Sequence, residues 1–144
     1  MSLGADAIQQ FGQALAKGYA ITPKFHEPPS KEERDSQIEI ISRVLAQQYT
    51  LFPKRPILHW KSIYLRVVET IQKEKQLGLW KYKIPEIESI RRSINYSADP
   101  RRFPNEPTPA ICTTPGFYCI NPQRFDDETK VELIKRIEEL KASF

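Results

Sequence analysis

Apolar side chains recur every three or four residues in several stretches of the chain, which is the spacing of one face of an α-helix. The first stretch predicts an N-terminal amphipathic helix over residues 1–20. The segment 21–29 is rich in proline, which lacks an amide donor and restricts its predecessor, so we expect an extended linker there. A second helix is predicted to begin at Lys31, because Ser30 and Glu33 have the spacing of a capping box.

Two further helices are predicted in the middle of the chain. The first runs from about Ile57 to Leu77, and the glycine at position 78 is placed to end it with a left-handed residue. The second covers residues 85–96, with Pro85 in its first turn, where a missing amide hydrogen is tolerated. Between them, residues 79–83 alternate apolar and basic side chains, which favours a brief extended piece that pairs with a strand downstream.

Residues 110–121 predict a β-hairpin around a central Pro115-Gly116 turn. A proline of L chirality prefers a turn whose twist suits a two-residue hairpin poorly, so a four-residue loop with the same register is an alternative. The expected pairs are Thr114 with Phe117, Thr113 with Tyr118, Cys112 with Cys119, and Ile111 with Ile120.

A C-terminal amphipathic helix is predicted over residues 125–144. Acidic residues from Asp126 onward stand at its start, where the helix dipole favours negative charge. Its apolar stripe consists of Leu133, Ile137, Leu140 and Phe144. This stripe either packs back on the domain or pairs with another subunit, so a homodimer through the terminal helices is one expectation.

The composition suits a single core without disulfides or metal, since 40% of the 144 residues are hydrophobic. We therefore expect a mainly α fold with a small β-hairpin, its main domain covering residues 30–124. The positive charge is uneven: residues 54–124 hold 13 Lys or Arg against 6 Asp or Glu, whereas both flanks are slightly acidic. Such a local excess attracts polyanions, although lysines that merely solvate helix faces are the alternative.

The predicted helix 85–96 carries a candidate reading face. On a helical wheel centred on Ile87, the neighbouring isoleucines define a side that we expect to be buried. The opposite side carries Ser89, Arg92, Ser93 and Tyr96. Such side chains fit a major groove, where arginine can donate two hydrogen bonds to a guanine edge. Arg91 falls near the apolar flank, from which it would reach sideways to a phosphate or an internal carboxylate.

Basic residues on both sides of this helix are candidates for phosphate contact. Arg101 and Arg102 follow it directly, before Pro104, and present two neighbouring guanidinium groups. Lys81 and Lys83 precede it and extend the footprint if folding gathers them on one surface. If folding gathers them on the same surface, further cations also extend the footprint: Lys54, Arg55, Lys61 and Arg124.

The order of helix pair, basic loop and hairpin resembles a winged helix-turn-helix domain. The segment 88–92, Glu-Ser-Ile-Arg-Arg, is also similar to recognition helices of phage-type DNA-binding proteins. This resemblance implies a winged-helix-like three-helix core with extra terminal helices, a recognition helix over 85–96 and a wing over 110–121. It favours binding of double-stranded DNA or a regulatory role. The alternatives are a protein-interaction adaptor on the same scaffold and binding to structured RNA.

No arrangement with catalytic or metal-binding spacing is visible, so we expect no enzyme activity, cofactor or metal. The two cysteines are expected to be free thiols, and His26 and His59 lack the spacing of a zinc finger. The chain start lacks the features of a signal peptide, and no apolar run approaches the roughly 18 residues of a membrane span. A cytoplasmic protein is the resulting expectation.

Overall fold

The computed structural model describes residues 29–142, which form helices around a small antiparallel sheet. In chain order the elements are α1 (Lys31–Leu51), β1 (Leu58–His59), α2 (Trp60–Gln76), α3 (Ile87–Ser97), the 3-10 turn η1 (Pro100–Arg102), β2 (Ala110–Thr114), β3 (Phe117–Ile120), the 3-10 turn η2 (Pro122–Arg124) and α4 (Asp127–Ala142). The predicted class, mainly α with a small β-hairpin, is confirmed. The predicted helix over 1–20, and the linker up to residue 28, lie outside the described residues.

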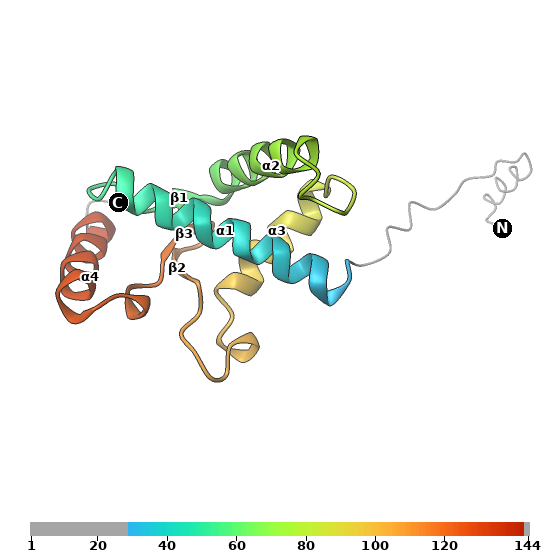
Figure 1. Ribbon diagram of the computed structural model, residues 1–144. Helices are drawn as coiled ribbons and strands as arrows, with labels where there is room; N and C mark the ends of the chain where they lie inside the picture. Colours follow the sequence, from blue (N-terminus) through green and yellow to red (C-terminus); the bar gives the residue numbers. More distant parts are fainter. Residues whose placement is uncertain (1–28, 143–144) are drawn as a thin grey trace, which may run out of the picture.

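Helix α1 runs across the domain and carries the other elements along its length (Figure 1). Helix α3 lies beside its N-terminal half, and α4 lies near its C-terminal end. One core joins all four α-helices and the hairpin, and its members include Ile41, Ile63, Ile94, Cys119 and Leu133. The predicted start of α1 is confirmed, because the Ser30 hydroxyl accepts a hydrogen bond from the amide of Glu33.

The start of α2 was expected near Ile57, but the helix begins at Trp60. His59 caps it: its Nδ1 atom accepts the amide hydrogen of Lys61, and residues 58–59 are drawn into the sheet as β1. At the other end the chain leaves α2 at Gly78, whose φ of +77° is the left-handed conformation predicted there.

The sheet has the order β1-β3-β2, and all its strands are antiparallel. The prediction that residues 79–83 pair with the hairpin is wrong, because β1 occupies the free edge of β3. Residues 79–83 instead belong to the connection between α2 and α3. There Trp80 is buried, and its indole N–H donates to the carbonyl of Lys83.

The hairpin turns at Pro115-Gly116 as expected, but its predicted register holds only for Thr114 with Phe117. An irregularity between Cys112 and Thr114 shifts the remaining pairs by one residue. The observed pairs are Cys112 with Tyr118, Ile111 with Cys119, and Ala110 with Ile120. A bulge of this kind accommodates the twist that an L-proline turn does not match. Cys112 and Cys119 therefore do not face each other, and both are free thiols.

Helix α3 begins at Ile87, two residues later than predicted, and its buried face differs from the one predicted. Ile87 is 40% exposed and Ile84, before the helix, is 41% exposed. The buried residues are Ile90, Ser93, Ile94 and Ser97. The predicted buried face was defined by the isoleucines alone. In the structure two serines, Ser93 and Ser97, also lie on the side of α3 that faces the core. The helix is therefore rotated relative to the prediction.

The C-terminal helix α4 packs on the domain's own core. Leu133 and Ile137 of its predicted stripe are buried there. Asp126 caps the helix as expected: its carboxylate accepts the amide hydrogen of Thr129, and this bond holds the pKa of Asp126 below its usual value. Two alternatives were predicted for this stripe, packing on the domain or pairing with another subunit. Leu133 and Ile137 pack on the domain. The last member, Phe144, lies outside the described residues.

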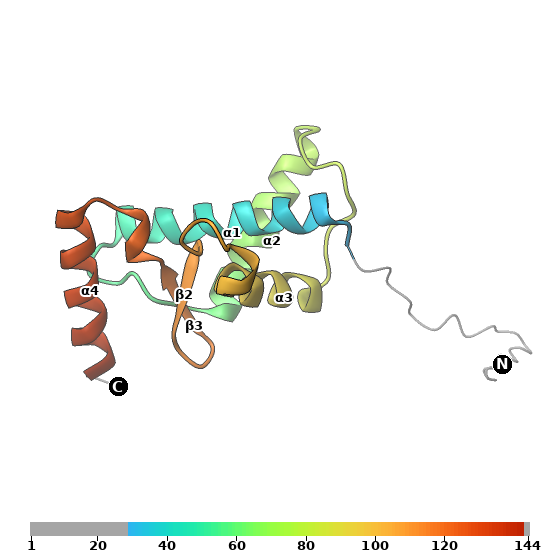
Figure 2. The ribbon, with the colours of Figure 1, turned by 90° about the horizontal axis from the view of Figure 1, so that it is seen from below.

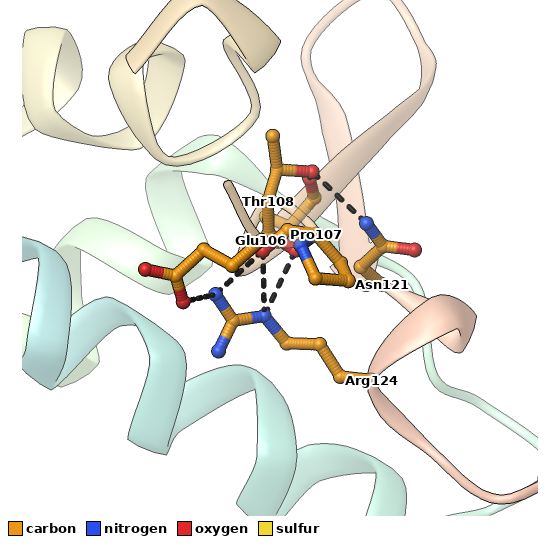
Figure 3. A network of polar contacts seen from close by, with 6 residues as sticks. Glu106, Pro107, Thr108, Asn121 and Arg124 are labelled. Carbon is orange, nitrogen blue, oxygen red and sulfur yellow. Dashed lines mark hydrogen bonds and ion pairs between the residues drawn. The ribbon is translucent and has the colours of Figure 1, made fainter. Parts of the chain in front are cut away.

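The long proline-rich loop between α3 and β2 is tied to the end of the hairpin (Figure 3). Arg124 donates hydrogen bonds to the carbonyls of Pro107 and Thr108 and pairs with the carboxylate of Glu106 at 3.3 Å. The amide of Asn121 donates to the Thr108 hydroxyl at 3.0 Å. The anchored loop brings the hairpin to the side of α3, as seen in Figure 2. Arg124 therefore holds the loop against the end of the hairpin.

The rotation of α3 can be tested with two identical substitutions in the same helix. Ile94→Ala removes a fully buried side chain and is expected to lower the free energy of unfolding by about 2–5 kcal/mol. Ile87→Ala, its control, removes a side chain in contact with water and is expected to cost less than about 1 kcal/mol. Urea denaturation measures both, and equal losses would contradict the observed orientation.

Candidate nucleic-acid interface

The solvent-facing side of α3 carries Glu88, Arg91, Arg92 and Asn95. Of the predicted reading face, only Arg92 is exposed as expected. The prediction is wrong for Ser93, which is buried at 0% exposure, and Ser89 and Tyr96 are half-buried. It is also wrong for Arg91, which was placed on the apolar flank but lies on the exposed side.

A buried polar network between α1 and α3 explains why the serines turn inward. The Ser93 hydroxyl donates to Oε1 of Gln37 at 2.5 Å and accepts a hydrogen bond from the Arg34 guanidinium at 2.7 Å. The same guanidinium nitrogen donates to the carbonyl of Ser89, and the Gln37 amide donates to the Ser89 hydroxyl. Because buried polar groups need partners, this network holds α3 in one rotation against α1.

At one edge of the exposed side of α3, an arginine is stacked on an aromatic ring. The guanidinium carbon of Arg91 lies 4.5 Å from the ring centre of Trp60, the first residue of α2. The hairpin turn holds the backbone of Trp60, since the Trp60 amide donates to the carbonyl of Gly116 at 2.9 Å. Lys61 adds a second cation, with its ammonium 5.9 Å from the same ring centre. A stacked guanidinium keeps its N–H edge free for a phosphate or a base.

The hairpin also orients a polar side chain on this face. The Tyr118 hydroxyl from β3 donates to Oδ1 of Asn95 at 2.5 Å. Burial raises the pKa of Tyr118 above its ordinary value, with Cys112 adding to the shift and Arg91 opposing it, so the hydroxyl keeps its proton as a donor. The bond leaves the amide N–H groups of Asn95 on the exposed side of α3, beside Arg91.

The other flank is a basic groove between α1 and α3. Tyr96 lies near two guanidinium groups, with Arg102 at 3.5 Å and Arg34 at 5.1 Å from its ring centre. Together with Arg92 these side chains line an open groove of about 400 Å³. Partial burial lowers the pKa of Arg34, and repulsion from Arg102 and Arg92 contributes, although Tyr96 opposes the shift.

The arginines of the domain differ in whether a carboxylate neutralises them. Among residues 29–142, no ion pair within 4.0 Å involves Arg91, Arg92 or Arg102. Arg101 is different, because it pairs with Asp99 at 3.0 Å through two hydrogen bonds to the carboxylate. The two arginines predicted as equivalent phosphate contacts are therefore unequal, and Arg102 is the one that the fold brings to α3.

The lysines predicted to extend the footprint lie in the connection between α2 and α3, and both are exposed. Lys81 lines a separate hollow with Arg43 and Glu74, on the side where α1 meets α2. The backbone carbonyl of Lys83 accepts a hydrogen bond from the Trp80 indole. The groove beside Tyr96 contains neither lysine.

The sequence prediction missed Arg34, Trp60 and Asn95. Arg34 stands 59 residues before its partner Ser93, so no local pattern links them. The one usable signal was the pair of serines among isoleucines in α3, because a small hydroxyl on such a face suits a close helix contact.

Within the described part of the chain, no group of three or more His, Cys, Asp or Glu side chains is arranged to hold a metal ion. The described helices also include none with the length and apolar content needed to cross a membrane. His59 acts as a helix cap and lies edge to face with the ring of Phe117, so its placement has a structural explanation.

The two thiols are expected to react at different rates. Burial raises the pKa of Cys119 to about 12, whereas Cys112 is exposed on the neighbouring strand. A water-soluble disulfide reagent should therefore modify one thiol per folded chain rapidly and the second only on unfolding. The fast phase should disappear in Cys112→Ser and persist in Cys119→Ser. Two equally fast thiols in the folded chain would contradict the assigned register.

No family model, curated protein or solved structure matches the chain. Its function is therefore inferred from the residues on the exposed side of α3 and their neighbours. These residues present guanidinium groups that have no ion-pair partner within residues 29–142, and two of the groups are stacked on aromatic rings.

Proposed function

We propose that this domain binds a nucleic-acid duplex, with the exposed side of α3 in the major groove. The observation that carries the proposal is the position of Arg91, which is exposed, stacked on Trp60 and without a carboxylate partner among the described residues. A guanidinium group held in this way can donate to an anion or a base acceptor, and the stack lowers the entropy lost when it binds one.

The chemistry of the neighbouring residues supports the same ligand. Arg92 and Asn95 share the exposed side of α3 with Arg91. Arginine donors suit the guanine edge and phosphate oxygens, and the amide donors of Asn95 suit base acceptors in the major groove. Glu88 lies on the same side of α3, where it repels phosphate and can accept from cytosine.

The arrangement of elements supports a winged helix-turn-helix assignment. The hairpin lies beside α3, and its turn contacts the start of α2 through Trp60 and Gly116. In domains of this class the later helix enters the major groove while the hairpin touches the backbone or the minor groove. Lys61, next to the hairpin turn, supplies a cation for that backbone contact.

The adaptor alternative loses several of its expected anchors. It relied on exposed apolar side chains of the hairpin and the C-terminal helix. Tyr118, Leu133 and Ile137 are buried instead, with exposures of 7% or less. A self-association through α4 has the same difficulty, because Leu133 and Ile137 of the predicted contact stripe face the core. The duplex proposal uses residues that remain at the surface.

The proposal is tested by measuring duplex affinity over a salt series. The probe is a fluorescent DNA duplex of mixed sequence, with an RNA duplex of the same sequence as a second arm. Arg91→Ala is expected to weaken DNA binding and to reduce the slope of log K against log salt by about 1. Lys135→Ala, which removes an exposed positive charge from α4, is the matched control and is expected to leave both unchanged.

DNA is expected to bind more tightly than RNA, because the major groove of A-form RNA is too deep and narrow for a helix. Equal losses in Arg91→Ala and Lys135→Ala would show that only overall charge matters and would overturn the α3 interface. Absence of binding to either duplex at low salt would overturn the proposed function itself.

A further inference from the structure

The groove between α1 and α3 is a second charged surface, on the other side of α3 from Trp60. Four cationic side chains line it: Lys31 and Arg34 from α1, Arg92 from α3, and Arg102 from the loop that follows α3. These residues come from three separate segments of the chain. The groove therefore exists only in the folded domain.

Among residues 29–142, carboxylates offset only part of the charge of this groove. Asp35 is the one carboxylate among the described residues that line it, and it is already paired with Lys31 at 2.9 Å. The three guanidinium groups remain: burial is the main cause of the lowered pKa of Arg34, and repulsion from Arg102 and Arg92 adds to it. Asp99, on the loop that follows α3, accepts two side-chain hydrogen bonds from Arg101, and Arg102 makes a smaller contribution to its lowered pKa. Gathering like charges costs stability unless a ligand of opposite charge offsets it.

The guanidinium groups are also held in place before any ligand arrives. Arg34 is fixed by hydrogen bonds from one nitrogen, Nη1, to the Ser89 carbonyl and the Ser93 hydroxyl. Arg102 lies over the Tyr96 ring at 3.5 Å, which leaves the edge of its guanidinium group available. Groups held in this way lose little side-chain freedom on binding, and a forked guanidinium matches the oxygens of a phosphate.

We propose that the groove formed by Arg34, Arg92, Arg102 and Tyr96 is a phosphate-binding site. Its volume of about 400 Å³ is larger than one phosphate and lies in the usual range of small-ligand pockets. The phosphate belongs either to the backbone of a duplex bound at α3 or to a free phosphorylated molecule. In the first case the inference rests on the proposed function, and in the second it stands independently of it.

Two adjacent arginines make a matched pair for the test. Arg102→Gln removes a cation from the groove, whereas Arg101→Gln removes the neighbouring cation, which pairs with Asp99 outside it. Both side chains are exposed, so both variants are expected to unfold at nearly the same temperature as the parent chain. Thermal unfolding followed by circular dichroism verifies this before binding is measured.

The first arm titrates the full chain with inorganic pyrophosphate at low salt and constant ionic strength, followed by calorimetry. Binding that Arg102→Gln weakens at least about fivefold, and Arg101→Gln leaves within about twofold, supports a site for a free phosphorylated molecule. The second arm repeats the DNA salt series. A slope reduced by about 1 in Arg102→Gln alone supports a site for a backbone phosphate.

The inference is overturned if the two variants behave alike in both arms. Its failure is distinguishable from that of the proposed function, because the two use different residues. Loss of pyrophosphate binding in Arg102→Gln, together with no duplex binding by the parent chain, supports the groove as a phosphate site and rejects the α3 interface. A duplex affinity that depends on Arg91, together with equal effects of Arg102→Gln and Arg101→Gln in both arms, supports the α3 interface and rejects the groove as a phosphate site.

Discussion

The buried hydroxyl of Ser93 is the contact on which the candidate interface depends. It donates to Gln37 and accepts from Arg34, so one small side chain satisfies two polar groups of α1 at once. Rotating α3 by one residue would leave an amide and a guanidinium without partners inside the domain, at a cost of about 1–3 kcal/mol for each neutral group and more for a charge. The exposed positions of Arg91, Arg92 and Asn95 follow from this rotation.

The hairpin reaches the same side of the molecule because its preceding loop is anchored. Residues 98–109 contain several prolines, which stiffen the loop without specifying where it goes. The path of the loop is fixed by Arg124, which follows the hairpin in the chain and donates hydrogen bonds to the carbonyls of Pro107 and Thr108. The hairpin then contacts both neighbouring helices, α3 through Tyr118 and Asn95, and α2 through Gly116 and Trp60.

The domain uses its arginines in two different ways. Arg43, Arg101, Arg124 and Arg136 are paired with carboxylates and link elements or stabilise loops. Arg91 and Arg102 lie over aromatic rings instead, on opposite flanks of α3. A carboxylate partner consumes the donors of a guanidinium group, whereas an aromatic ring contacts only its face. The stacked arginines are therefore the ones chemically prepared for an external anion.

The sequence by itself located the four helices within residues 29–142, the hairpin turn and several of the caps, because these depend on residues that are close along the chain. The capping serine at position 30, the left-handed Gly78 and the Asp126 cap were all predicted correctly. The orientation of α3 was not, since periodicity locates an apolar stripe but cannot tell that Ser93 is buried by partners 56 and 59 residues away.

Only the tertiary structure decided which basic residues act together. Arg101 and Arg102 are indistinguishable in sequence, yet one is held by Asp99 and the other lies against Tyr96. The sequence located the excess of positive charge in the middle of the chain, because charge is counted residue by residue. Which of these arginines pair with carboxylates and which lie over aromatic rings depends on contacts that exist only after the chain has folded.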